Sequence, residues 1–117
     1  QQGESDVIEK TTTEQYVKNI NTLREGLNKE WGFSPLWLLA KSTLHPTVYN
    51  DPAGEERIRT GLAQLWKTPG FRPGPDTDTL AGENRGGPTS KRHFSGLGQR
   101  RAGLMWFATI YAELCRE

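Results

Sequence analysis

NRGGPTSKRHFSGLGQRR, residues 84–101, runs directly into AGLMWFATIYA, residues 102–112. The first part is rich in glycine and carries five Lys or Arg side chains and one His, with no Asp or Glu. The second part contains the most apolar segment of the chain. We therefore expect a cationic, glycine-rich arm that leads into a helix of the hydrophobic core.

The length and composition indicate one small domain. The chain has 117 residues, within the usual range for a single domain. Its hydrophobic fraction of 33% is low beside the roughly 45–50% of an ordinary globular chain, so the core must be small. With 13 Gly and 7 Pro, a sizeable part of the chain is expected to be irregular. Residues 1–117 are thus predicted to form a single helical domain.

The net charge of +1 hides an asymmetry along the chain. Residues 1–30 carry four basic and six acidic side chains, and residues 31–83 carry five and six. Residues 84–117 carry six basic and two acidic side chains, a net charge of +4. An anionic partner is therefore expected to bind the C-terminal third.

The sequence leaves the compartment open. Cys115 is the single cysteine, which excludes an intrachain disulfide. No apolar run approaches the ~18–20 residues of a membrane span, and no secretory signal pattern is present. The first residue is Gln1, which suggests a processed mature chain, secreted or imported into an organelle, or a trimmed chain.

An amphipathic pattern predicts a helix over residues 13–31. Threonines at 11–13 supply N-cap hydroxyls, and Gly32 ends the segment. Residues 16–27, YVKNINTLREGL, resemble the first helix of the four-helix photosystem II assembly factors of the thylakoid lumen. The closing helix of that family is missing here, so no function is carried over. The apolar positions recur every three or four residues: Tyr16, Val17, Ile20, Leu23, Leu27 and Trp31.

Three further helices are expected. A short one covers LWLLAKSTL (36–44), with Ser34-Pro35 before it and Pro46 after it. Another runs from 52 to 67, and the last begins at Thr89 or Ser95 and ends near Arg116. The predicted fold class is mainly α: a small four-helix bundle-like domain with one short helix. A polar arm (1–12) precedes the bundle, and a long, basic, Gly/Pro-rich irregular loop (68–98) precedes the last helix.

The basic arm is the predicted binding site for an anion or an acidic partner. Glycines let backbone N–H groups approach an anion closely, and arginine binds phosphate or carboxylate through two N–H groups. The alternative is a solvated loop whose charges balance the acidic first helix. The residues assigned to the site are Arg85, Lys91, Arg92, His93, Arg100 and Arg101.

Two alternatives to protein binding remain open. His93 and Phe94 could stack on bases, as in proteins that bind or package single-stranded RNA. His45 and His93 could act as general acid and base in a secreted ribonuclease-like effector, although nothing in the sequence brings them together. No pair of residues has metal-ligand spacing. We expect no metal, no cofactor and no catalytic residues.

The tryptophans suggest a protein interface. Each predicted helix has one, at positions 31, 37, 66 and 106, and the simplest expectation is that all four meet in the core. The segment LWLL (36–39) is nonetheless apolar on too many sides for so small a domain, so Trp37, Leu38 and Phe71 are predicted to face a partner. We therefore expect a non-enzymatic small helical subunit or binding module of a larger assembly. It would dock an apolar patch and the basic arm onto an acidic or phosphate-bearing surface.

Overall fold

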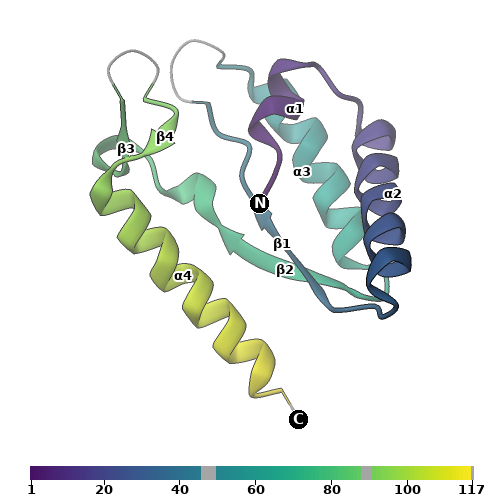
Figure 1. Cartoon of the computed structure of the whole chain (residues 1–117). Coiled ribbons are helices and arrows are strands. Elements are labelled where there is room, and N and C mark those ends of the chain that lie inside the picture. The colour runs from purple at the N-terminus through teal and green to yellow at the C-terminus, as the bar shows by residue number, and fades with distance from the viewer. Residues whose placement is uncertain (46–49, 88–90, 117) are drawn as a thin grey trace.

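The computed structural model describes residues 1–45, 50–87 and 91–116, which form four α-helices and two small sheets (Figure 1). Helix α3 connects the parallel strands β1 and β2, and β3 and β4 form an antiparallel hairpin. Two short 3₁₀ turns, η1 and η2, follow β2. The elements are α1 (Glu4–Ile8), α2 (Thr13–Trp31), β1 (Trp37–Lys41), α3 (Pro52–Trp66), β2 (Phe71–Asp76), η1 (Thr77–Thr79), η2 (Gly82–Asn84), β3 (Arg85–Gly86), β4 (His93–Phe94) and α4 (Gly96–Leu114).

The prediction of a mainly α, four-helix bundle-like domain is wrong, because the chain has a mixed α/β fold. The short helix expected over 36–44 is strand β1, whose Leu39 and Ala40 are buried. A short apolar run between two prolines suits a buried strand as well as a buried helix, and periodicity does not separate the two. Whether the run forms a strand depends on the strand with which it pairs, and that strand lies more than thirty residues further along the chain.

That partner, β2, has the sequence FRPGPD and lies inside the segment predicted as the irregular loop 68–98. Its two prolines have no backbone N–H to donate, so the sequence of this segment does not predict a strand. The edge position in a two-stranded sheet tolerates these prolines. Gly74 is needed where the strands meet, since a Cβ there would lie 2.6 Å from the Ala40 backbone nitrogen. The hairpin β3–β4 also falls in this segment.

The three long helices are confirmed, and their N-caps explain where they begin. Thr12 accepts a hydrogen bond from Gln15 N at 3.1 Å, and Asp51 accepts one from Gly54 N at 2.9 Å. Ser95 caps α4 by accepting from Gly98 N at 3.1 Å. Thr89, the other expected start of the last helix, and Pro46 lie outside the described residues. Gly32 ends α2 with φ 72°, a left-handed conformation that favours glycine.

The core lies where α2 and α3 meet the β1–β2 sheet, closed at one end by α1. Fully burying an aliphatic or aromatic side chain contributes about 1.5–3 kcal/mol, so this cluster supplies most of the fold's stability. Trp37 and Trp66 pack against it, whereas Trp31 is 48% exposed and Trp106 lies on α4. The four tryptophans therefore do not all meet. The cluster contains Val7, Tyr16, Ile20, Leu39, Ile58, Leu62, Leu65 and Phe71.

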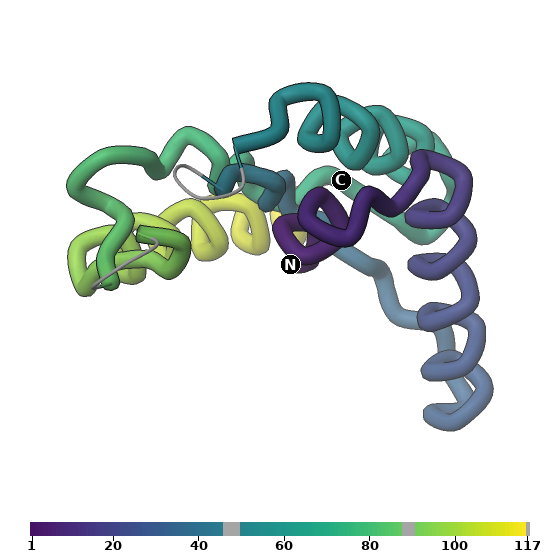
Figure 2. Tube along the Cα trace, turned by 90° about the horizontal axis from the view of Figure 1, so that it is seen from above, coloured from purple at the N-terminus to yellow at the C-terminus, as the bar shows by residue number. Residues whose placement is uncertain are grey.

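Residues 1–12, expected to be a polar arm, are joined to the domain. Helix α1 buries Val7 in the core, and the Tyr16 hydroxyl donates to the Gln2 carbonyl at 2.9 Å. Gly3 lies against the Ser42 carbonyl, where a Cβ would come within 2.5 Å of the oxygen. Seen from above, α2 and α4 lie at opposite sides of the molecule, with α1 and α3 between them (Figure 2). The N-terminal residues thus reach the neighbourhood of the basic hairpin.

Gly98→Ala will lower the free energy of unfolding by about 1–3 kcal/mol, the usual cost of adding a methyl group to a closely packed site. Helix α4 rests on η2 at this residue, and an added Cβ would collide with the backbone carbonyl of Asn84. Gly103→Ala is the matched control, because a Cβ there meets nothing within 4 Å. It should raise stability by up to about 1 kcal/mol. Urea unfolding measures both, and equal effects would show that α4 does not rest on η2.

Candidate functional site

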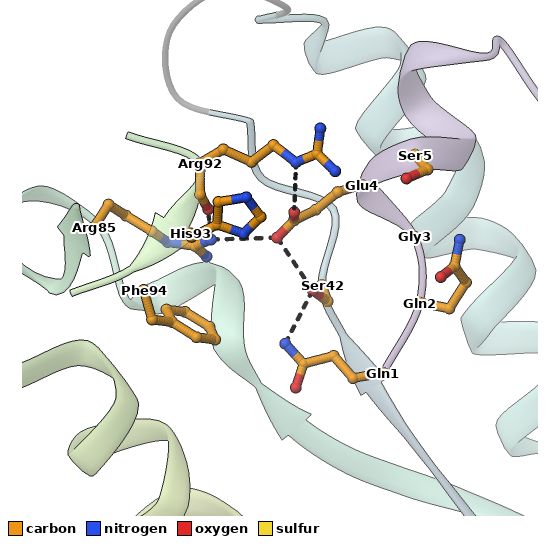
Figure 3. A pocket seen from close by; sticks show the side chains of 10 residues that line it. All are labelled: Gln1, Gln2, Gly3, Glu4, Ser5, Ser42, Arg85, Arg92, His93 and Phe94. Atoms are coloured by element: carbon orange, nitrogen blue, oxygen red, sulfur yellow. Dashed lines mark hydrogen bonds and ion pairs between the residues drawn. The ribbon is translucent and has the colours of Figure 1, made fainter. Parts of the chain in front are cut away.

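An open cleft of about 340 Å³ lies between the N-terminal segment and the β3–β4 hairpin (Figure 3). It brings together three parts of the chain that are far apart in sequence. Their meeting depends on α1 anchoring residues 1–5 and on the hairpin folding over them. The lining residues are Gln1, Gln2, Gly3, Glu4, Ser5, Ser42, Arg85, Arg92, His93 and Phe94.

Arg85 forms one wall of the cleft and is held almost entirely by the protein itself. Its side chain is 2% exposed. The guanidinium donates to the carbonyls of Leu80 (2.6 Å), Thr77 (3.1 Å) and Arg92 (2.8 Å), and to Glu4 Oε1 at 3.2 Å. It also lies over the Phe94 ring, 4.3 Å from the centroid. Arg85 therefore organises the hairpin and has little capacity left for a ligand.

Arg92 and His93 line the cleft, and Lys91 directly precedes them in the chain. Lys91 and His93 are exposed, and Arg92 is half-buried with its Nε 3.8 Å from Glu4 Oε2. Figure 3 shows Glu4 between the two guanidinium groups of Arg85 and Arg92, with His93 beside them. One carboxylate thus faces two guanidinium groups, so the cleft keeps a positive balance. We call Lys91, Arg92 and His93 the basic rim.

Arg100 and Arg101, the other two predicted site residues, lie on α4 and not at the cleft. Arg101 donates to Glu83 Oε1 at 2.8 Å and to Asn84 Oδ1 at 2.7 Å, which ties α4 to η2. Arg100 is exposed. Neither residue lines the cleft. The six residues predicted as one site therefore fall into three groups: the buried Arg85, the basic rim, and Arg100 and Arg101 on the surface of α4.

The histidines occupy different surroundings. His45 is 1% exposed and is absent from the cleft lining, where His93 lies. A general acid–base pair must reach the same phosphate, and a buried His45 has no open path to one. Of the two rings expected to stack on bases, Phe94 has the Arg85 guanidinium over one face, whereas His93 is exposed. His45 and His93 therefore do not line the same cleft, and RNA binding stays a prediction.

The predicted apolar interface also divides. Phe71 is fully buried in the core, and Trp37 packs edge-on against its ring at 6.3 Å between centroids. Leu38 is half-buried. The outward-facing apolar side chains near this strand are Leu36 (44% exposed) and Phe33 (62% exposed). Phe71 therefore contributes to stability and does not face a free surface.

A buried charged cluster joins the end of β1 to α3 and η1. Asp78 accepts from Thr43 N (2.7 Å), Thr43 Oγ1 (2.6 Å), Leu44 N (2.9 Å) and Arg59 Nε and Nη2 (3.2 and 3.0 Å). Burial acts to raise the pKa of Asp78, but these hydrogen bonds outweigh it and hold the pKa below its usual range. Arg59 also pairs with Glu55 at 3.3 Å. Burial, opposed by Arg59, raises the pKa of Glu55.

The feature that sequence reasoning missed is the outer face of α4. Leu104, Phe107, Tyr111 and Leu114 are 60–79% exposed, although the segment was expected to enter the core. The inner side of α4 contacts η2, β2 and β4. The signal was present in the sequence, because α4 is apolar on more than one side, and a helix that covers one domain needs a single apolar face.

Comparison with protein-family models, with curated proteins and with solved structures finds no match to this chain. Within the described residues, no helix combines the length and apolar character that a membrane crossing requires. The same residues contain no group of three or more His, Cys, Asp or Glu positioned to hold a metal ion.

Proposed function

We propose that this chain is a non-enzymatic binding module of a larger protein assembly, and that its basic rim binds an acidic or phosphate-bearing group of the partner. The observation that supports the proposal is the open cleft bordered by Arg92 and His93, with Lys91 exposed on the same hairpin. Charge-assisted hydrogen bonds from a guanidinium to carboxylate or phosphate are roughly twice as strong as neutral ones.

Arg85 and Glu4 have a supporting role in this proposal. The Arg85 guanidinium donates to the carbonyl of Arg92, which fixes the backbone of the rim. Glu4 occupies the side of Arg92 that faces the cleft, so a ligand would compete for the guanidinium or bind its outer edge. This arrangement favours a small anionic group on a flexible partner segment, because the cleft is about 340 Å³ and open to solvent.

Lys91→Gln/Arg92→Gln will weaken binding of an acidic peptide about tenfold. The two removed cations together are expected to contribute ~1.4 kcal/mol to the free energy of binding. Fluorescence anisotropy of a labelled oligoglutamate peptide and its phosphoserine counterpart measures the affinity. Wild-type binding should weaken as salt rises from ~50 to ~200 mM. The matched control is Lys18→Gln/Lys29→Gln, which removes the same charge from exposed positions of α2.

Equal losses in both variants would mean that net charge, and not the rim, binds the peptide. Absence of peptide binding at the lower salt concentration would overturn the proposal. Preference for a labelled single-stranded RNA over both peptides would favour the RNA-binding alternative and would overturn the choice of a protein partner.

A further inference from the structure

Helix α4 has two opposite faces. On the inner face Gly98 and Ala102 are buried, and Met105, Trp106 and Thr109 are half-buried. The Trp106 indole donates to Gln1 at 3.2 Å, and Glu113 pairs with Arg72 at 3.7 Å. The inner face therefore already covers the helix's own domain. The outer face carries five exposed apolar side chains, and Ile110, 45% exposed, lies at its border. The five are Leu97, Leu104, Phe107, Tyr111 and Leu114.

The spacing on the outer face follows a heptad repeat. Leu97, Leu104 and Tyr111 recur every seven residues, and Arg100, Phe107 and Leu114 form the second series. Alternating steps of three and four residues are the a and d positions of a coiled coil. Ala102 and Thr109 fall on the opposite side of this repeat, which is the side that faces the domain. We call the six a and d positions the α4 seam.

We propose that the α4 seam binds a second copy of this chain in an antiparallel, two-fold symmetric pair. In antiparallel coiled coils an a position lies level with a d position of the other helix. A two-fold axis between Met105 and Trp106 then pairs all six seam residues. Leu97 meets Leu114 of the second copy, Arg100 meets Tyr111, and Leu104 meets Phe107. A two-fold interface requires this kind of self-complementary surface.

The charge on the seam favours the antiparallel orientation. A parallel pair would place the two copies of Arg100 together, and no acidic residue lies between positions 84 and 112 to neutralise them. The antiparallel pair instead places each Arg100 against the Tyr111 ring of the other copy, where a cation–π contact contributes about 0.5–1 kcal/mol. It also brings the positive N-terminus of each helix beside the negative C-terminus of the other.

The exposed area is sufficient for a dimer. Exposure of the five apolar seam residues runs from 37% for Leu97 to 79% for Leu114. With aromatic side chains burying about 150–250 Å² each, the seam supplies on the order of 600 Å² per copy, or about 1,200 Å² for the pair. That value lies at the lower end of specific interfaces, so the dimer should dissociate on dilution. Figure 1 shows α4 along one edge of the molecule, with its outer side uncovered.

The test is sedimentation velocity over a concentration series from low to high micromolar. The wild-type chain should move from monomer to dimer, and Leu104→Glu/Phe107→Glu should remain monomeric throughout. Both positions are more than 60% exposed, so this variant should keep the wild-type circular dichroism and, at concentrations where the wild type is monomeric, the wild-type melting temperature. Ala112→Glu, an exposed position off the seam on the same helix, should still dimerise. A monomeric wild type overturns the proposal, as does a dimer that the double substitution leaves intact.

Cys115 reports the orientation. It is exposed and free, just beyond the last seam residue. In the antiparallel pair the two copies of Cys115 are about 28 Å apart along the helices, at 1.5 Å per residue. A disulfide requires Cα atoms within about 7 Å, so mild oxidation should leave the dimer without one. A disulfide-linked dimer that forms in the wild type and is lost in Leu104→Glu/Phe107→Glu would overturn the antiparallel register.

Discussion

Asp78→Ala is expected to lower the free energy of unfolding by about 3–5 kcal/mol, because removing one member of a buried ion pair leaves its partners without compensation. The side chain of Asp78 is 7% exposed and accepts five hydrogen bonds. Without it, the backbone N–H groups of Thr43 and Leu44 lose their acceptor, and Arg59 keeps only Glu55. A domain of this size is stable by only about 5–15 kcal/mol, so the change removes a large part of the total.

Urea unfolding monitored by tryptophan fluorescence measures the effect. Asp76→Ala is the control, because Asp76 is 43% exposed and pairs with the half-buried Lys41 at 3.2 Å. Asp76 also caps η1 by accepting from Asp78 N at 3.2 Å, so that substitution should cost about 1–2 kcal/mol, still less than Asp78→Ala. If Asp78→Ala leaves too little folded protein, Asp78→Asn keeps the shape and removes the charge, and should be intermediate. Equal costs at positions 76 and 78 would contradict a structural role for the buried cluster.

The difference in unfolding free energy between wild type and Asp78→Asn should also depend on pH. The folded-state pKa of Asp78 lies below its unfolded value. A carboxyl of this kind stabilises the fold above the unfolded pKa, about 3.9, and the contribution is lost as pH falls through the folded pKa. The difference between wild type and Asp78→Asn should therefore be full near neutral pH and shrink below about pH 4. Glu55 has the opposite sign, because its raised pKa favours the protonated form in the folded state.

The helices were predictable from sequence because their signals are local. Thr12, Asp51 and Ser95 cap helices that also show apolar periodicity, and caps and periodicity act within a few residues. The β1–β2 sheet was not predictable in the same way. Its register pairs Trp37 with Phe71, across the whole of α3. Because β2 contains two prolines and a glycine, its sequence lacks the apolar alternation typical of strands and was interpreted as a loop.

The candidate site shows a related limit. Composition correctly located the excess of positive charge in residues 84–117, but composition does not distinguish an arginine that binds a ligand from one that supports the fold. Arg85 lies on β3, and Arg92 lies directly before β4 of the same hairpin. Only the fold shows that Arg85 is buried and that Arg92 reaches the surface. The partners of Arg85 include Glu4, 81 positions away in the chain.

The exposed seam of α4 follows from the same reasoning about helices. An apolar run such as LMWFA at 104–108 predicts burial, and the sequence alone assigns that burial to the domain's own core. In the structure the core is already filled by α2, α3 and the sheet, so α4 uses only one face for its own domain. The remaining face is what the proposed second copy would cover.

Arg85→Met will lower the free energy of unfolding by about 3–5 kcal/mol, since it removes a buried charge that compensates Glu4 and satisfies three backbone carbonyls. Methionine can pack on the Phe94 ring but donates no hydrogen bonds. The loss should be concentrated in the hairpin, because Arg85 joins η1, β3 and the backbone of Arg92. Arg85→Lys should recover little, as a single ammonium group does not reproduce the guanidinium fork.

Amide hydrogen exchange separates this local effect from general unfolding. In Arg85→Met the amide of Ser95, which donates to the Asn84 carbonyl at 2.9 Å beside the hairpin, should lose protection before the amides of α2 and α3, whose core residues make none of the Arg85 hydrogen bonds. Arg101→Met is the control, since Arg101 is 44% exposed and its pair with Glu83 lies at the surface. Because Arg101 also donates to Asn84 Oδ1 at 2.7 Å, the substitution should cost about 1–2 kcal/mol, still less than Arg85→Met. If Arg85→Met proves as mild as Arg101→Met and still binds acidic peptide, the rim is fixed by other contacts and Arg85 is dispensable to the site.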